Sequence, residues 1–181
     1  MAWNNGPLAL YHGSNTIAFQ SATGLAVHIP FAIDWNACRD FTDFGKAFYT
    51  TTSPHQAREW ANKSIRFSRG KRGTAQTRAA IIRFDVDREE LASLAVLAFV
   101  RDTADFYYFV HYCRSRGIPH GRNGPQNAYD VVYGPVALRN QQLIIQDSDQ
   151  VSFHTQAAAD CLCRNGTVVH DIATAANGLL P

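Results

Sequence analysis

The sequence lacks the features of several protein classes. Lys and Arg number 17 against 15 Asp and Glu, so the formal net charge is only +2 and gives no global attraction to nucleic acid or membrane. No apolar run approaches the roughly 20 residues that a membrane-spanning helix needs. The N-terminal residues Met-Ala-Trp-Asn-Asn-Gly-Pro contain neither a charged nor an apolar segment, so no signal peptide is expected. These absences predict a cytoplasmic protein with no membrane partner.

Cysteine is scarce, and its spacing does not suit a metal site. The four cysteines form no Cys-x-x-Cys pair, and the last two are too close in sequence to bridge each other easily. Seven histidines are scattered along the chain. The sequence therefore predicts reduced thiols in a reducing compartment and no bound metal. The thiols are those of Cys38, Cys113, Cys161 and Cys163.

Common nucleotide-binding and hydrolase motifs are also missing. Residues 70–74, Gly-Lys-Arg-Gly-Thr, have the wrong spacing for a phosphate-binding loop. No Gly-x-Gly-x-x-Gly, His-Glu-x-x-His or Gly-x-Ser-x-Gly motif occurs, and no internal repeat is visible. The function must therefore be sought in less familiar segments.

The composition predicts one globular domain over residues 1–181, with 46% apolar and 12% aromatic residues. Ser53, Asp87, Thr103 and Thr155 can each cap a helix, and Gly117 can end the helix that begins after Thr103. Gln56 would complete a capping box with Ser53, and the side chains expected on the buried face of that helix are those of Ala57, Trp60, Ala61 and Ile65. Strands and helices do not alternate regularly, so we expect the α+β class, with helices packed on split sheets. The expected strands are 8–12, 79–86, 95–100, 129–133 and 150–154.

The first expected strand ends on an imidazole followed by a flexible glycine, in residues 10–14, Leu-Tyr-His-Gly-Ser. His12 could hydrogen-bond a ribose hydroxyl, and Gly13 would let a planar amide approach the main chain. A strand-end histidine before an ordinary turn explains the same residues.

Two later segments place a ring and an amide on short strands. In residues 43–51, Phe48 and Tyr49 alternate between the faces of a strand, so one ring could stack on a flat ligand, or both could be core. In residues 149–155, Gln150 opens a late strand that leads into a helix. It could equally be an exposed residue of an ordinary edge strand.

Taken in this order, the segments resemble ADP-ribosyltransferases of the His-Tyr-Glu type. The likeness is closer to a small, poorly characterised bacterial family of that superfamily, with a His-Tyr-Gln pattern. It extends from residue 10 to about residue 162. The matching segments are 11–14, 43–51, Gln56-Ala57, Trp60-Ala61, 129–137 and 150–155.

The resemblance implies an ADP-ribosyltransferase-like fold whose split sheets enclose a cleft for NAD, the co-substrate. His12 would bond the adenine-side ribose, Gly13 would hold the nicotinamide amide through its backbone, and Tyr49 would stack on the nicotinamide ring. Residues 43–46 would shape the floor of the cleft. The implied cofactor-binding residues are His12, Gly13, Ser14, Phe44, Gly45 and Tyr49, and the implied catalytic residues are His12, Tyr49 and Gln150.

Two residues depart from the expected patterns. Ala47 replaces a glycine of the smaller family, which matters only if the backbone there needs a positive φ. Gln150 replaces the superfamily's catalytic Glu, so the charge that would stabilise an oxocarbenium-like state is missing. The loss of one preorganised electrostatic group typically costs about 10²–10³ in rate. Gln150 could orient a ribose hydroxyl, or could contact the acceptor through its amide.

The function implied is transfer of ADP-ribose from NAD to a macromolecular acceptor, a protein or a nucleic acid. Family-level analogy suggests a toxin with a cognate antitoxin. NAD hydrolysis without an acceptor is an intermediate outcome, and a non-catalytic module that binds NAD or a partner is the alternative. The basic loop 66–78 is either a solvated loop or a contact for phosphates of NAD or of a nucleic acid.

Overall fold

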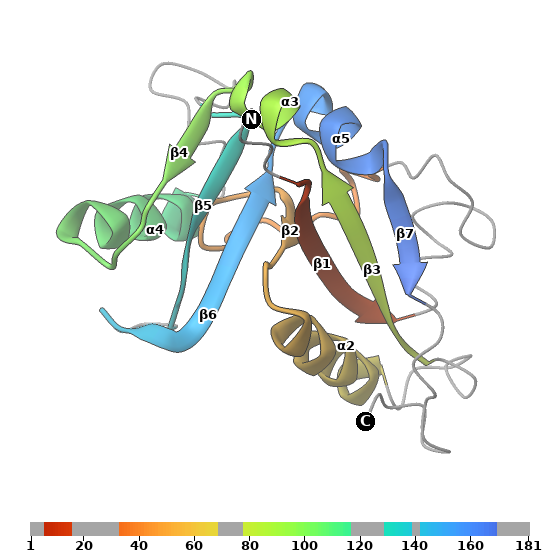
Figure 1. The fold of residues 1–181 in the computed structure, drawn as a ribbon. Coiled ribbons are helices and arrows are strands. Elements are labelled where there is room, and N and C mark those ends of the chain that lie inside the picture. The colour runs from red at the N-terminus through yellow and green to blue at the C-terminus, as the bar shows by residue number, and fades with distance from the viewer. Residues whose placement is uncertain (1–5, 16–32, 69–77, 117–128, 139–141, 170–181) are drawn as a thin grey trace.

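Two β-sheets organise the part of the chain that the computed structural model describes (Figure 1). This part consists of residues 6–15, 33–68, 78–116, 129–138 and 142–169. Sheet A has the strand order β1-β3-β7, and sheet B has the order β2-β6-β5-β4. With four helices packed around them in the described residues, the strands place the chain in the α+β class, as predicted.

Sheet A is antiparallel and is built around a central strand that is buried on both faces. Strand β3 (Ala79–Val86) has the predicted bounds and pairs with β1 (Leu8–Asn15) and with β7 (Gly166–Val169), which was not predicted. The sequence predicted that the first strand would stop at Gly13-Ser14. This is wrong, because the pairing of β1 with β3 continues to Asn15 opposite Ala79.

Sheet B contains a long hairpin that the sequence predicted only in part. Strands β5 (Val131–Ala137) and β6 (Ile144–Phe153) pair antiparallel, with an irregularity between Pro135 and Ala137 that accommodates the proline. Gln150 therefore lies within β6 and does not open the strand, which corrects the prediction. The short strands β2 (Phe48–Thr50) and β4 (Val96–Ala98) complete the sheet.

The four helices begin at the predicted caps. Ser53, Thr103 and Thr155 each accept a hydrogen bond from a backbone N–H three residues ahead, and Asp87 accepts from the N–H groups two and three residues ahead. These contacts satisfy N–H groups that the helix itself leaves unpaired. The helices are α2 (Pro54–Ser68), α3 (Arg88–Ala92), α4 (Ala104–Arg116) and α5 (Gln156–Cys163). The predicted helix stop at Gly117 lies outside the described residues.

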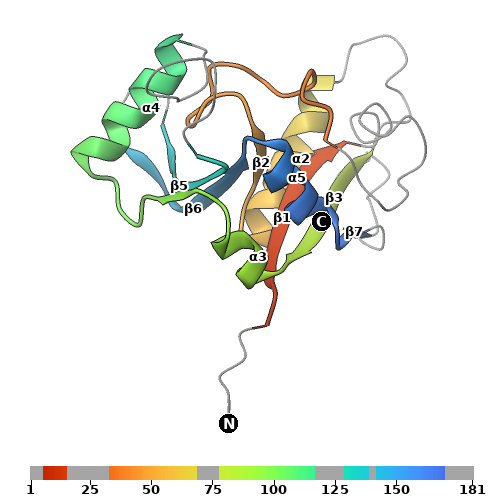
Figure 2. The same cartoon turned by 90° about the horizontal axis from the view of Figure 1, so that it is seen from above.

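Three apolar clusters hold the layers together. The largest contains side chains of both sheets and of α5. Helix α5 lies at one end of the two sheets, as Figures 1 and 2 show. A second joins α2 to sheet A through Ala57, Ala61 and Ile65, the helix face that the sequence predicted to be buried. A third joins α4 to the other face of sheet B. Helix α2 lies where the two sheets splay apart (Figure 1).

Candidate functional site

In the described part of the chain, the two sheets meet edge to edge at an isolated bridge between Tyr11 of β1 and Thr51, the residue after β2. Tyr11 and Thr51 exchange two backbone hydrogen bonds, of 2.8 and 2.9 Å. In an antiparallel ladder, Gly13 would be the next residue on this edge and would face Tyr49. The ladder does not continue, because the Tyr49 carbonyl instead accepts a hydrogen bond from the His12 side chain. The backbone pairing between the two strands therefore ends at Tyr11, and we call the unpaired stretch of edge after it the β1–β2 opening.

His12 is held firmly in this opening. Its Nδ1 lies 2.6 Å from the carbonyl oxygen of Tyr49, and its ring stacks on Phe48 with centroids 4.4 Å apart. Burial lowers the pKa of His12 below its ordinary value, and the hydrogen bond to Tyr49 opposes this only partly. A carbonyl can only accept, so Nδ1 carries the proton and Nε2 is the acceptor nitrogen of a neutral ring.

Gly13 lies against α2 more closely than any other residue type would allow. A Cβ atom built there would lie 1.8 Å from the carbonyl oxygen of Ala57 and 3.0 Å from the backbone nitrogen of Ala61. The glycine therefore has a packing role that the sequence did not reveal. Because backbone groups alternate in direction along a strand, its N–H and C=O point to the same edge as those of Tyr11, toward β2.

Tyr49 is fixed by its hydroxyl group. That oxygen lies 2.8 Å from Oγ1 of Thr42, accepts from the backbone N–H of Phe44 at 2.9 Å and donates to the carbonyl of Gly45 at 2.8 Å. Burial raises the pKa of the Tyr49 hydroxyl far above its ordinary value, so the group stays neutral. The ring is half-buried, and the hydroxyl anchors the loop before β2.

That loop contains two of the predicted cofactor-binding residues. Phe44 has no exposed surface and packs against Phe99, Phe106 and Tyr49, so it acts as a core residue. Gly45 has a φ of 84°, a conformation that favours glycine. Ala47 is not among the residues with positive φ, so the alanine there is tolerated.

Gln150 is buried, and its amide nitrogen is fully engaged. Nε2 donates to Oδ2 of Asp43 at 2.8 Å and to the carbonyl of Pro135 at 2.9 Å. Among the described residues no donor contacts its Oε1, and this oxygen is not sealed from solvent. Gln150 can therefore offer a ligand an acceptor but no donor, which argues against the acceptor contact through its NH₂ group.

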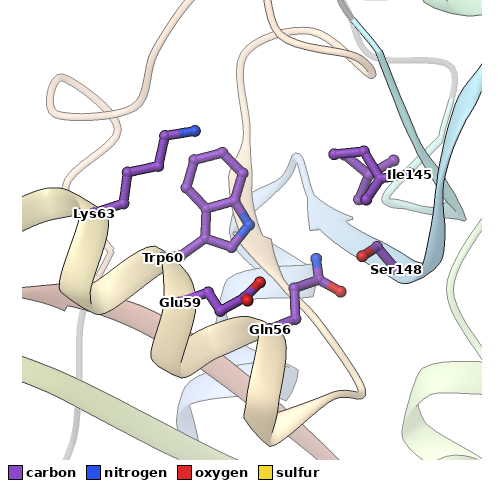
Figure 3. A pocket seen from close by; sticks show the side chains of 7 residues that line it. Gln56, Glu59, Trp60, Lys63, Ile145 and Ser148 are labelled. Atoms are coloured by element: carbon purple, nitrogen blue, oxygen red, sulfur yellow. The ribbon is translucent and has the colours of Figure 1, made fainter. Parts of the chain in front are cut away.

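A small pocket lies between α2 and the β5–β6 hairpin (Figure 3). It has a volume of about 130 Å³, and Trp60 points into it from the helix toward Ile145 and Ser148 on the opposite wall. Trp60 is 45% exposed, although the sequence predicted it on the buried face of the helix, and Lys63 Nζ lies 4.4 Å from the centre of its ring. The complete lining is Gln56, Glu59, Trp60, Lys63, Val136, Ile145 and Ser148.

Gln56 fastens this wall of the pocket to β6. Its Nε2 donates to the carbonyl of Asp149 at 2.7 Å, and its Oε1 accepts from the backbone N–H of the same residue at 3.1 Å. The sequence predicted that Gln56 would complete a capping box with Ser53. Its side chain instead pairs with β6, and the N–H of Ser53 bonds Thr51 Oγ1 at 3.0 Å.

The predicted site residues are thus linked in one chain of contacts. His12 bonds the carbonyl of Tyr49, the hydroxyl of Tyr49 bonds the loop around Asp43, and Asp43 bonds Gln150. Ser14 lies on the same face of β1 as His12, because side chains alternate along a strand. The predicted basic loop 66–78 begins later than expected, because α2 continues to Ser68, and residues 69–77 lie outside the described part of the chain.

Metal ligands and reactive thiols do not gather at this site. In the described residues, no group of three His, Cys, Asp or Glu side chains could hold a metal ion. The four cysteines are unpaired, and burial raises the pKa of Cys38 to about 11 and those of Cys113 and Cys163 to about 12. Over the same residues, no helix is long and apolar enough to cross a membrane.

Residues 8–147 match the family described as "Protein of unknown function (DUF3990)", and the chain belongs to this family. The matched stretch includes His12, Gly13, Tyr49 and Trp60 and ends shortly before Gln150. Among curated proteins, no sequence matches the chain.

Proposed function

We propose that the protein binds NAD at the opening between β1 and β2 and cleaves it as an ADP-ribosyltransferase-like enzyme. The observation that carries this proposal is the interrupted ladder at Gly13. The N–H and C=O of Gly13 point toward the opening, where a strand partner would otherwise lie. The carboxamide of nicotinamide has an acceptor oxygen and a donor NH₂, so it can pair with both groups as a strand would.

His12 supports the same ligand from the adjacent position. Its neutral ring has Nδ1 committed to Tyr49 and Nε2 as the acceptor nitrogen. A ribose hydroxyl is a suitable donor to such a nitrogen. A neutral, oriented imidazole therefore suits ribose recognition better than phosphate recognition, which would favour a cation.

The pocket at Trp60 suits a single flat ring. Its volume of about 130 Å³ is well below the roughly 300–1,000 Å³ of pockets that enclose whole drug-sized ligands. Trp60 follows Ala57, the neighbour of Gly13, by three residues, so the two lie close together on the helix surface. An indole face can stack on nicotinamide beside the Gly13 edge.

Gln150 would assist the bond-breaking step through its amide oxygen, because its amide nitrogen is already bonded to Asp43 and Pro135. The bond between ribose C1′ and the nicotinamide nitrogen breaks, the electron pair leaves with nicotinamide, and C1′ becomes an oxocarbenium-like cation. A nucleophile of the acceptor then bonds C1′ and loses its proton. Gln150 Oε1 accepts from a ribose hydroxyl and orients it, but without a charge the rate stays about 10²–10³ below that expected with a carboxylate.

The acceptor in this proposal is a macromolecule, either a protein or a nucleic acid, and the reaction needs no metal. The cytoplasmic location that the sequence predicts, and the toxin role with a cognate antitoxin that family-level analogy suggests, belong to the same proposal. Labelled NAD incubated with a cell lysate tests the acceptor class. If protease treatment destroys the labelled product, the acceptor is a protein. If nuclease treatment destroys it, the acceptor is a nucleic acid.

Calorimetric titration with NAD tests the site itself. We expect His12→Ala and Trp60→Ala each to weaken NAD binding by about fivefold or more, the loss of at least one hydrogen bond or one stacking contact. Trp60 is largely exposed, so its variant should fold, and Tyr108→Ala, at 74% exposure on α4, is the matched control. Unchanged NAD affinity in both site variants would overturn the proposed site.

The alternative, a non-catalytic module, is favoured by one observation. The Tyr49 hydroxyl and the Gln150 amide nitrogen are already fully bonded within the chain, so both residues have a structural role without any ligand. NAD binding without release of nicotinamide, with lysate present, would support this alternative. Release without label transfer would indicate hydrolysis.

A further inference from the structure

We propose that Asp43 is a positioning residue that orients the carboxamide of Gln150, an inference that rests on the proposed cleavage of NAD. The carboxylate of Asp43 lies between three separate parts of the fold. Its Oδ2 accepts from Gln150 Nε2 at 2.8 Å and from the backbone N–H of Ala137 at 2.9 Å. Its Oδ1 accepts from Arg114 at 2.7 Å. Asp43 thereby links the loop before β2 to β5, β6 and α4.

Arg114 fixes the carboxylate in this place. Its Nε and Nη2 both donate to Oδ1 of Asp43, and its guanidinium also donates to the carbonyls of Ala137 and Leu138, at 2.8 and 3.1 Å. The side chains of Asp43 and Arg114 are 14% and 23% exposed. An ion pair so well bonded and so little exposed is screened far less than a surface pair.

The two neighbours of the Gln150 amide leave it one orientation. The carboxylate of Asp43 and the carbonyl of Pro135 are both acceptors, so both require the NH₂ group of the amide. A reversed amide would place its oxygen against two other oxygens. Asp43 and Pro135 thus direct Oε1 away from both of these acceptors, and in our proposal a ribose hydroxyl donates to it there.

The same geometry explains how a neutral residue occupies a position where a carboxylate would be chemically stronger. In Gln150→Glu, a second carboxylate would lie against Asp43, with no hydrogen to donate to it or to Pro135. If Asp43 is also changed to Asn, the new amide at position 43 can donate to the new carboxylate at position 150. The exchanged pair therefore restores the contact between the two positions, although the N–H of Ala137 loses its acceptor.

The test is a double-mutant cycle with wild type, Asp43→Asn, Gln150→Glu and the exchanged pair. Melting temperature and the steady-state kinetics of nicotinamide release from NAD are measured for each. Asp43→Asn should lower kcat about tenfold with little change in KM, because Asp43 acts through Gln150 and does not touch NAD. The exchanged pair should melt higher than Gln150→Glu and release nicotinamide faster than either single variant. Asp130→Asn is the control.

Asp130 suits this purpose because it also accepts hydrogen bonds from two parts of the fold, the N–H of Ala95 and the hydroxyl of Thr155. Its variant should lose stability and keep kcat. An exchanged pair that is no more stable and no faster than the worse single variant would overturn the positioning role. In another outcome, the melting temperatures show coupling between positions 43 and 150, but none of the four proteins releases nicotinamide, even with lysate present. This outcome would overturn the proposed NAD cleavage and with it the catalytic part of this inference.

Discussion

Gly13 and His12 are adjacent in β1, yet different neighbours constrain them. The backbone of α2 approaches Gly13 on one face of the strand, while the ring of Phe48 and the carbonyl of Tyr49 hold His12 on the other. The pair of residues is therefore required by packing as well as by the proposed ligand. Substitutions can separate these two requirements.

Gly13→Ala should destabilise the fold severely. The new Cβ would lie 1.8 Å from a backbone oxygen of α2, and only a shift of the helix could relieve this contact. We expect a loss of about 3 kcal/mol in the free energy of unfolding, at the upper end of the cost of overpacking. Urea unfolding measures it, with Gly6→Ala as control because nothing lies within 4 Å of a Cβ there. Equal midpoints for the two variants would contradict the close approach.

His12 should make stability depend on pH. Because burial lowers its pKa in the folded state, the unfolded chain binds a proton first as pH falls through about 6.5. The unfolded state then holds more protons than the folded state. The contribution of His12 to the free energy of unfolding is therefore present above this pH and is lost below it. The free energy of unfolding should therefore fall further between about pH 8 and pH 5.5 in wild type than in His12→Gln.

The control for this measurement is His55→Gln, at an exposed position in the first turn of α2. It should retain the full pH dependence of wild type. Parallel pH profiles for wild type and His12→Gln would show that the imidazole is not held neutral by burial.

At the scale of elements, α2 joins the two sheets. Its apolar face packs on sheet A, and Gln56 binds the backbone of Asp149 in sheet B. The helix therefore sets the separation of the walls around Trp60. A displacement of α2 would therefore change both the pocket and the β1–β2 opening.

Gln56→Glu should loosen this attachment. A carboxylate cannot donate to the carbonyl of Asp149, so one buried acceptor loses its partner and faces a charge. The expected cost is about 3 kcal/mol in the free energy of unfolding. Gln146→Glu, the same change at an exposed position of β6, should stay within about 0.5 kcal/mol. Similar losses in both variants, measured by urea unfolding, would contradict the role of Gln56.

Local signals predicted the helices well but the hairpin poorly. The caps at Ser53, Asp87 and Thr155 act within a few residues, so the sequence reveals them directly. The polar residues 146–149 do not look like a strand, yet they belong to β6, which pairs with β5 at Asp149 and again at Ile144 on the two sides of an irregularity. Gly134-Pro135 resembles a chain turn, but the glycine lies beneath Phe44 and Phe99 inside β5.

The candidate site divides in the same way. The order of the segments and their resemblance to ADP-ribosyltransferases selected His12, Tyr49 and Gln150, and the structure links these residues through contacts. The sequence did not reveal the exposure of Trp60 or the contact of Asp43 with Arg114, because both depend on residues far apart in the chain. Pairings over such distances are set by the tertiary fold and leave no local pattern.

At the scale of the whole molecule, the two sheets of the described residues meet at an isolated bridge between Tyr11 and Thr51 and splay apart around α2 (Figure 1). Apolar clusters hold each layer, so the opening beside Gly13 need not close for the fold to be stable. The proposed enzyme would use this architecture to present the backbone edge of Gly13 in β1, beside the imidazole of His12, to the ligand.

The most direct test of this account is the release of nicotinamide from NAD by the purified protein, measured by chromatography with a whole-cell lysate as the source of acceptors. The account predicts release above that of lysate alone, and clearly reduced release by Trp60→Ala, a variant that should remain folded. Release by wild type no greater than that of the lysate alone would contradict the proposed enzymatic function.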